Sequence, residues 1–106
     1  MRDLLLETYK SKIEPLIFWE NHRQIKKWGV QEHDAYTWFT ILAEEFGELA
    51  QAILQNEFEQ GIPEKVIKEA IQTATLAIKI AEMYRAKLID HPEGSEAMAR
   101  NILEEQ

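Results

Sequence analysis

Two groups of oxygen-bearing side chains stand out as residues that could do chemistry together. The first group is Glu44, Glu45 and Glu48, and the second, further along the chain, is Glu69 and Gln72. Carboxylates that meet in a fold repel one another strongly unless a cation neutralises them. Ligation by oxygen alone selects hard ions such as Mg²⁺ or Mn²⁺. If the two groups meet, the residue types therefore predict a site for a divalent cation.

Other kinds of site are excluded or disfavoured by the residues present. The sequence has no cysteine, which excludes disulfides, thiolate zinc sites and cysteine nucleophiles. In helical di-iron sites a His follows a Glu by three residues, and none of His22, His33 and His91 does so. The acidic groups therefore remain the candidate.

The elements that must position these residues are predicted to be helices. The prolines and glycines fall mostly between long stretches that lack both, and no alternating strand pattern is sustained. We expect helices at about residues 3–27, 35–56 and 63–89, and a short one from Ser95 to about Glu105. An all-α hairpin or bundle is the fold class that this pattern supports.

Local signals mark the ends of these helices. Pro15 disfavours helix at Glu14, which predicts a kink or a break in the first helix. Gly29 suits the left-handed residue that follows a helix, Asp34 is a predicted N-cap, and Pro63 suits the first turn of the third helix. Both acidic groups therefore lie well inside predicted helices.

In the predicted helix 35–56, the helical period places part of the first acidic group among apolar residues. At about 100° per residue, the helix 35–56 has an apolar arc, which consists of Trp38, Ile41, Leu42, Leu49, Ala52 and Ile53. Glu45 falls inside this arc, Glu48 lies at its edge and Glu44 lies further out. Because burying an unpaired carboxylate is costly, Glu45 needs a partner. Gly47 is unfavourable inside a helix and suggests close approach by another backbone.

The helix 63–89 is apolar on nearly all sides. Its apolar residues are Val66, Ile67, Ala70, Ala74, Ala77, Ile78 and Ala81 on one side and Leu76, Ile80 and Met83 on another. Glu69 projects between Leu76 and Ile80, and Gln72 lies one turn along. A helix of this kind packs on more than one side, which predicts a homodimer or homotetramer that supplies the missing neighbours.

A simpler alternative remains open at this stage. Glu is a good helix former, and a Glu–Glu pair usually marks a solvated helix face. In that case the protein is a structural helical bundle whose acidic side chains only face water. The two hypotheses differ in whether Glu45 and Glu69 are buried.

Composition narrows the class of partner. The chain has 106 residues, with 12 Lys+Arg against 19 Asp+Glu and a formal net charge of −7. This length fits one domain with a single core, and the charge disfavours a nucleic-acid polymer as partner. No apolar run approaches the length of a membrane span, and the N-terminus has no signal-peptide pattern. We therefore expect a cytoplasmic protein with no membrane partner.

The acidic segment resembles a known family. The stretch Ile41-Leu-Ala-Glu-Glu-Phe-Gly-Glu-Leu-Ala-Gln-Ala-Ile-Leu54 is similar to the core of the MazG-like nucleotide pyrophosphohydrolases, in the all-α NTP pyrophosphatase superfamily. Their motif is Glu-Glu-x-x-Glu followed, after a spacer, by Glu-x-x-Asp on the adjacent helix. The residues that match this motif are Glu44, Glu45, Glu48 and Glu69. Gln72 stands where the family has Asp. Residues 27–33 also resemble members of this family, and the similarity covers about residues 20–85.

The resemblance implies a self-associating, four-helix-type domain that hydrolyses a nucleoside triphosphate to the monophosphate and pyrophosphate with Mg²⁺, as nucleotide-pool house-cleaning. By this resemblance Glu45, Glu48 and Glu69 are metal ligands. Glu44 is a ligand or orients the attacking water, so Glu44 and Glu45 are the expected catalytic residues. The Gln72 oxygen can also ligate Mg²⁺ but brings no charge. The alternative is therefore a catalytically impaired nucleotide-binding or protein-interaction module.

A nucleotide also needs residues that bind its base and its phosphates. The indole rings of Trp28 and Trp38 could stack on a base, although core packing is the competing interpretation for Trp38. A Gln and a His after the first helix could read the base edge. Two lysines on one side of the third helix could meet phosphates, unless they form its solvated stripe. The expected substrate-binding residues are Trp28, Gln31, His33, Lys68 and Lys79.

Overall fold

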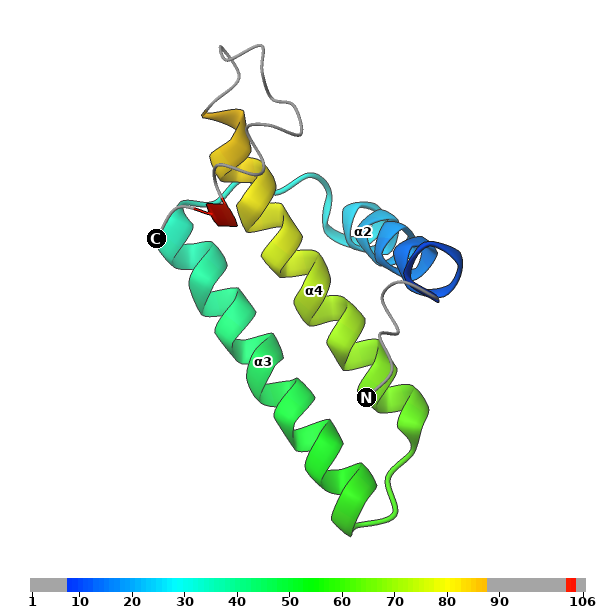
Figure 1. The fold of residues 1–106 in the computed structure, drawn as a ribbon. Helices are drawn as coiled ribbons and strands as arrows, with labels where there is room; N and C mark the ends of the chain where they lie inside the picture. The colour runs from blue at the N-terminus through cyan, green and yellow to red at the C-terminus, as the bar shows by residue number, and fades with distance from the viewer. Residues whose placement is uncertain (1–7, 88–102, 105–106) are drawn as a thin grey trace.

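The computed structural model describes residues 8–87 and 103–104, and every element in these ranges is helical (Figure 1). The elements are the π-helix η1 (Tyr9–Ile13) and the α-helices α2 (Glu14–Trp28), α3 (Ala35–Phe58) and α4 (Pro63–Ala86). The predicted all-α class is confirmed for these residues. None of the described helices has the length and apolar character needed to cross a bilayer. The predicted helix from Ser95 to Glu105 lies outside the described residues, apart from Leu103 and Glu104.

The first helical segment changes type at the predicted kink. The π-helix η1 leads directly into α2, and Pro15 lies in the first turn of α2, where its missing N–H removes no helical hydrogen bond. The residue that follows α2 is Gly29, whose φ is 77° and whose N–H donates to Ile25 O at 2.7 Å. Glycine adopts this backbone conformation without strain, so the predicted end of the helix is confirmed.

Asp34 and Gly61 fix the two ends of α3. Asp34 is the predicted N-cap, since its Oδ1 accepts a hydrogen bond from Thr37 N at 2.8 Å. After α3, the N–H of Gly61 donates to Gln55 O at 2.8 Å. A Cβ at Gly61 would lie 2.9 Å from Asn56 N, so this turn requires glycine. The turn returns the chain directly into α4.

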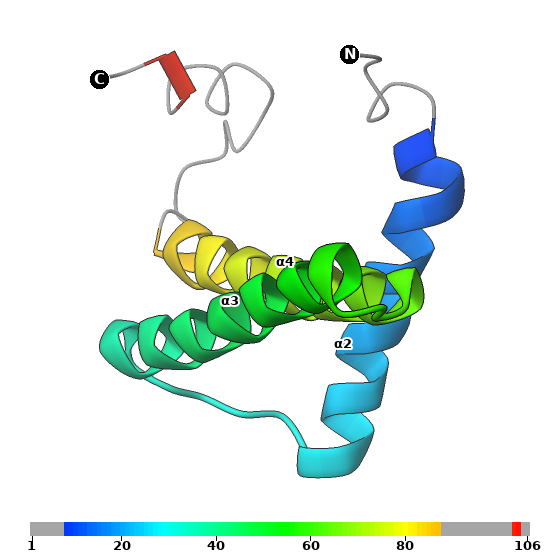
Figure 2. The ribbon, with the colours of Figure 1, turned by 90° about the horizontal axis from the view of Figure 1, so that it is seen from below.

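The helices α3 and α4 form a long hairpin and lie side by side (Figure 1). Helix α2 packs against α4 and crosses the hairpin at a steep angle (Figure 2). Helix α4 therefore has neighbours on two sides, as its apolar pattern predicts. Its buried residues are Glu69, Ile71, Gln72, Thr75 and Leu76. Buried Glu and Gln are uncommon, so this face of α4 is the place to look for a site.

Large parts of α3 remain uncovered. The buried apolar residues of the described chain are Trp38 and Ala52 from α3 and Ile71 and Leu76 from α4. Ile53 belongs to the apolar arc that the sequence predicts, yet it is 43% exposed, because it lies at the edge of that arc away from α4. A Cβ at Gly47 would have no neighbouring atom within 4 Å among the described residues. The close approach expected at Gly47 is therefore not made by these residues.

Candidate functional site

Three carboxylates from α3 and α4 form a cluster. Glu45, Glu48 and Glu69 each offer an oxygen atom, and these atoms all lie within 4.8 Å of one another. Glu69 is 7% exposed, whereas Glu45 is half-buried and Glu48 is exposed, so the cluster runs from the interior to the surface. Glu44 is exposed and is not a member of this cluster. The burial of Glu69 disfavours the alternative in which the acids only face water.

The carboxamide of Gln72 lies between two of these carboxylates. With its nitrogen turned toward them, Nε2 donates to Glu45 Oε2 and to Glu69 Oε2, both at 3.2 Å. Turned over, the carboxamide would present its oxygen to the same two acceptors, which is favourable only when a cation lies among them. Gln72 can therefore bridge the carboxylates as a donor without metal and can offer an oxygen to a metal.

The surroundings of Glu45 favour its protonated form. Burial, followed by repulsion from Glu48 and from Glu69, raises the pKa of the Glu45 carboxyl from 4.5 to about 7. In the metal-free protein Glu45 is therefore largely protonated at pH values well below 7. A cation among the three carboxylates would favour the charged form and lower the pKa.

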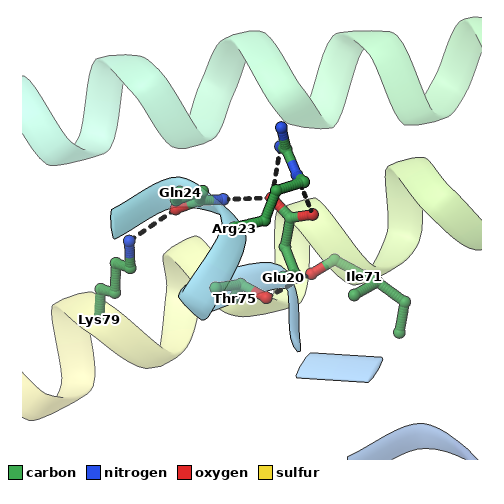
Figure 3. Close-up of polar contacts among 6 residues, drawn as sticks. All are labelled: Glu20, Arg23, Gln24, Ile71, Thr75 and Lys79. Carbon is green, nitrogen blue, oxygen red and sulfur yellow. Dashed lines mark hydrogen bonds and ion pairs between the residues drawn. The ribbon is translucent and has the colours of Figure 1, made fainter. Parts of the chain in front are cut away.

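Helix α2 carries a polar network that reaches Lys79 of α4 (Figure 3). Glu20 accepts hydrogen bonds from Arg23 Nε at 3.0 Å, from Arg23 Nη2 at 2.8 Å and from Gln24 Nε2 at 2.6 Å. The other end of the Gln24 amide accepts a hydrogen bond from Lys79 Nζ of α4 at 2.6 Å. These contacts connect α2 to α4 and fix the directions of the Arg23 and Lys79 side chains.

Glu20 remains ionised in this network. Burial alone would raise the pKa of its carboxyl, but hydrogen bonds from Arg23 and Gln24 and the charge of Arg23 outweigh burial and hold the pKa below its ordinary value. The pKa of Arg23 is raised by its hydrogen bond to Glu20 and also by the charge of Glu45, so the network lies close to the carboxylate cluster.

Glu20, Arg23 and Gln24 were not among the residues predicted from the sequence. Their i, i+3 and i+4 spacing places them on one side of a helix, and this was the available signal. The sequence does not show that α2 crosses α4 beside Gln72, because the residues in contact are far apart in the sequence.

A large pocket opens beside the cluster, between α2, the connection 29–34 and the hairpin of α3 and α4. Its volume is about 870 Å³, near the upper end of the roughly 300–1,000 Å³ usual for ligand pockets. Glu45 and Gln72 belong to its wall. All the residues predicted to bind substrate also line it, namely Trp28, Gln31, His33, Lys68 and Lys79. The structure therefore places the predicted substrate-binding residues around a pocket to which Glu45 and Gln72 also belong.

The two tryptophans that line the pocket differ in how much of each residue is exposed. Trp38 is 7% exposed, and its ring already contacts His33 at 4.8 Å between centroids and Lys79 Nζ at 5.7 Å. Core packing is thus confirmed for Trp38. Trp28 is exposed, and Lys27 Nζ lies 4.6 Å from its ring centre. Trp28 is the tryptophan that offers a flat surface together with positive charge.

The ammonium group of Lys79 is partly buried at the wall of the pocket. Burial lowers the pKa of Lys79, although the charges of Glu20 and Glu82 act in the opposite direction. Gln24 provides the hydrogen bond that is described for this ammonium group, and an ammonium has three donors. Lys79 can therefore donate to an oxygen atom of a ligand in the pocket.

The fold and the site define a helical protein with a carboxylate cluster at the edge of a large, partly cationic pocket. Comparison of the chain with known protein families, with curated proteins and with solved structures finds no match.

Proposed function

We propose that this protein is a cytoplasmic, Mg²⁺-dependent nucleoside triphosphate pyrophosphohydrolase of the MazG-like kind, which serves nucleotide-pool house-cleaning. The observation that carries the proposal is that Glu45 and Gln72 contribute both to the carboxylate cluster and to the wall of the pocket. A ligand in the pocket therefore lies beside the cluster. Aromatic, imidazole and cationic side chains around one pocket suit a ring system that carries phosphates.

The cluster has the chemistry of a site for a divalent cation. All its donor atoms are oxygens, which hard ions prefer, and the pKa of Glu45 is raised to about 7 by burial and then by the negative charges of Glu48 and Glu69. Glu45, Glu48 and Glu69 would hold Mg²⁺ or Mn²⁺, and Gln72 would turn its oxygen toward the ion. When bound, the ion supplies positive charge for the phosphate oxygens and for a water molecule.

The remaining roles fall to side chains of this chain. Glu45 in its charged form can accept a proton from the attacking water. Glu44, which is exposed and outside the cluster, would orient that water. Attack of that water on the α-phosphorus would form the nucleoside monophosphate and break the bond from this phosphorus to the α,β-bridging oxygen, which leaves with pyrophosphate. Lys68, which precedes Glu69 on α4 and lines the pocket, can neutralise phosphate charge.

Self-association is part of the proposal. The described helices expose many large apolar side chains, among them Trp19 of α2, Phe46 of α3 and Ile67 of α4. Exposed apolar area on this scale is unusual for a monomer. The proposal is a homodimer or a homotetramer.

The test is pyrophosphate release from a panel of nucleoside triphosphates with Mg²⁺. We expect release from at least one nucleotide, and we expect Glu69→Gln to lower it by at least about a hundredfold, because a ligand charge is lost. The matched control is Glu64→Gln, an exposed Glu of the same helix, which should keep full activity. Equal activity in both variants would show that the cluster does not act in the reaction.

The second candidate function is a catalytically impaired nucleotide-binding module, and Gln72 is the observation that favours it. A carboxamide at this position removes one negative charge from the cluster. Titration calorimetry with the same nucleotides separates the candidates, since the impaired module binds a nucleotide and releases no pyrophosphate. Neither binding nor release with any nucleotide would contradict both proposals.

A further inference from the structure

The side of α3 that faces away from α4 carries a continuous apolar surface. Phe39, Phe46 and Ile53 recur at seven-residue spacing along the helix, a spacing that keeps side chains on one face. We define the outer face of α3 as Tyr36, Phe39, Ala43, Phe46, Gly47, Ala50, Ile53 and Leu54, all of them exposed and none charged. Helix α2 lies on the α4 side of the hairpin, so no described helix covers this face (Figures 1 and 2).

The exposed area of this face is large enough for a stable pair. The aromatic side chains Tyr36, Phe39 and Phe46 are 84%, 65% and 65% exposed. With Ile53 and Leu54 they present about 600 Å² of apolar surface, given the roughly 150–250 Å² of each aromatic side chain. Two such faces together would bury about 1,200 Å², where stable protein interfaces begin.

Gly47 is the smallest residue of the outer face of α3 and lies near the middle of the helix. A glycine in a helix interior is unfavourable unless something requires it, and no described atom would contact a Cβ at Gly47. The midpoint of α3, which runs from Ala35 to Phe58, falls between Phe46 and Gly47. A two-fold axis at this midpoint would bring the smallest residue of the face against an identical helix.

We propose that the outer face of α3 binds the same face of a second copy of this chain, with the two helices antiparallel. Three pairs are symmetric about the midpoint of the helix, and they are Phe46 with Gly47, Ala43 with Ala50, and Phe39 with Leu54. Each Phe46 ring then occupies the space above Gly47 of the second copy, and the alanines permit the close approach on either side.

Charge opposes a second copy less at this face than at acidic parts of the surface. Each chain carries a formal net charge of −7, so two copies repel one another wherever acidic surfaces meet. The members of this face carry no charge. The exposed Glu57, seven residues after Ala50 on the same side of the helix, lies opposite Tyr36 of the second copy and far from the second Glu57. The proposal specifies the surface of the proposed self-association and is independent of the proposed hydrolysis.

The first test is the mass of the protein in solution, measured by light scattering at tens of micromolar. We expect a dimer, and we expect Phe46→Lys to raise the dissociation constant at least about a hundredfold, because a central aromatic side chain is replaced by a charge at two places. The matched control is Phe18→Lys on α2, since Phe18 has the same 65% exposure as Phe46. A monomeric wild-type protein, or dissociation by Phe18→Lys and not by Phe46→Lys, would overturn the proposal.

A second test defines the orientation and does not require a disruptive variant. The chain has no cysteine, so single cysteines report contacts directly. Mixed Ala43→Cys and Ala50→Cys chains should form a disulfide between the two variants on oxidation, whereas Ala50→Cys alone and Ala81→Cys, exposed on α4, should not. Cross-linking of Ala50→Cys with itself would indicate parallel helices and overturn the antiparallel pairing.

Discussion

Glu45 is the carboxylate of the cluster that also lines the pocket, and its protonation would connect stability with the proposed metal binding. Its carboxyl has a raised pKa of about 7 because burial and two neighbouring carboxylates disfavour its charge. A group of this kind releases its proton when a cation arrives. Its titration is therefore observable with no substrate present.

The metal-free protein should lose stability as the pH rises from about 4.5 to about 7. In this interval folded Glu45 keeps a proton, with a pKa of about 7, whereas the unfolded chain has lost it, with a pKa of 4.5. The unfolded state thus binds fewer protons, and the free energy of unfolding falls as pH rises. Urea unfolding in EDTA at several pH values measures this slope.

The matched variant for this measurement is Glu45→Gln, which removes the titrating group and keeps its shape. The pH slope over the same interval should become smaller in this variant. The affinity of the wild-type protein for Mg²⁺ should rise with pH up to about 7, because the ion must displace the proton of Glu45. An affinity that is flat over this interval would show that Glu45 is not a ligand.

The substitution Gln72→Asp would add a negative charge to the cluster. We expect Gln72→Asp to destabilise the metal-free protein by about 1–3 kcal/mol, because two donors to carboxylates are replaced by a charge, and to strengthen Mg²⁺ binding. Urea unfolding with EDTA and with Mg²⁺ measures both effects. The control Gln51→Glu adds the same charge at an exposed position of α3 and should change neither. Weaker Mg²⁺ binding by Gln72→Asp would contradict the oxygen-ligand role of Gln72.

At the scale of elements, Glu20 holds Gln24, the residue of α2 whose side chain contacts Lys79 of α4. The side chain of Glu20 is 10% exposed, and it accepts hydrogen bonds from Arg23 and from Gln24, which holds Lys79 of α4. Removing the Glu20 charge weakens several of these contacts at once. The position of α2, and with it one wall of the pocket, therefore depends on this residue.

Glu20→Gln should lower the free energy of unfolding by about 1–3 kcal/mol, the usual effect of weakening charge-assisted hydrogen bonds in a buried setting. Amide hydrogen exchange should accelerate in α2 more than in α3. The control is Glu14→Gln, an exposed Glu at the start of the same helix, which should leave both measurements unchanged. Equal effects of the two substitutions would mean that the network does not attach α2.

The helix boundaries could be predicted because their causes are local. Gly29 at a positive φ, Asp34 as an N-cap and Pro63 in a first turn each act within a few residues of their position. The helical phase of Glu45 and Glu69 follows from periodicity alone, which is why the meeting of these acids could be expected. Local chemistry and a fixed helical period thus account for the cluster.

The contributions of α2 and the outer face of α3 could not be predicted in the same way. The contact of Gln24 with Lys79 joins residues that are 55 positions apart, and no local pattern specifies where α2 crosses α4. The exposure of Ile53 likewise depends on which side of α3 its neighbour covers. The apolar arc of α3 is wider than the surface that α4 covers. The sequence therefore does not reveal what covers the remaining residues of the arc, such as Ile53.

For the whole molecule, the acidic balance and the sparse core make a bound cation important. Among the described residues four apolar side chains are buried, each with 9% exposure or less, and the chain has a net charge of −7. We therefore expect a small free energy of unfolding. A ligand that binds only the folded state should raise this free energy by a large fraction. This effect is a measurement on the complete chain and requires neither substrate nor turnover.

Mg²⁺ or Mn²⁺ at a hundredfold excess over its dissociation constant should stabilise the fold by about 2.7 kcal/mol, which for a domain of this size raises Tm by about 10–20 °C. Non-specific screening by cations would raise Tm for any variant, so the comparison of two substitutions on α4 is decisive. Glu69→Gln, inside the cluster, should abolish most of the rise, and Glu64→Gln, exposed at the start of the helix, should keep it. If both variants respond alike, the ions act through the overall charge and the cluster holds none of them.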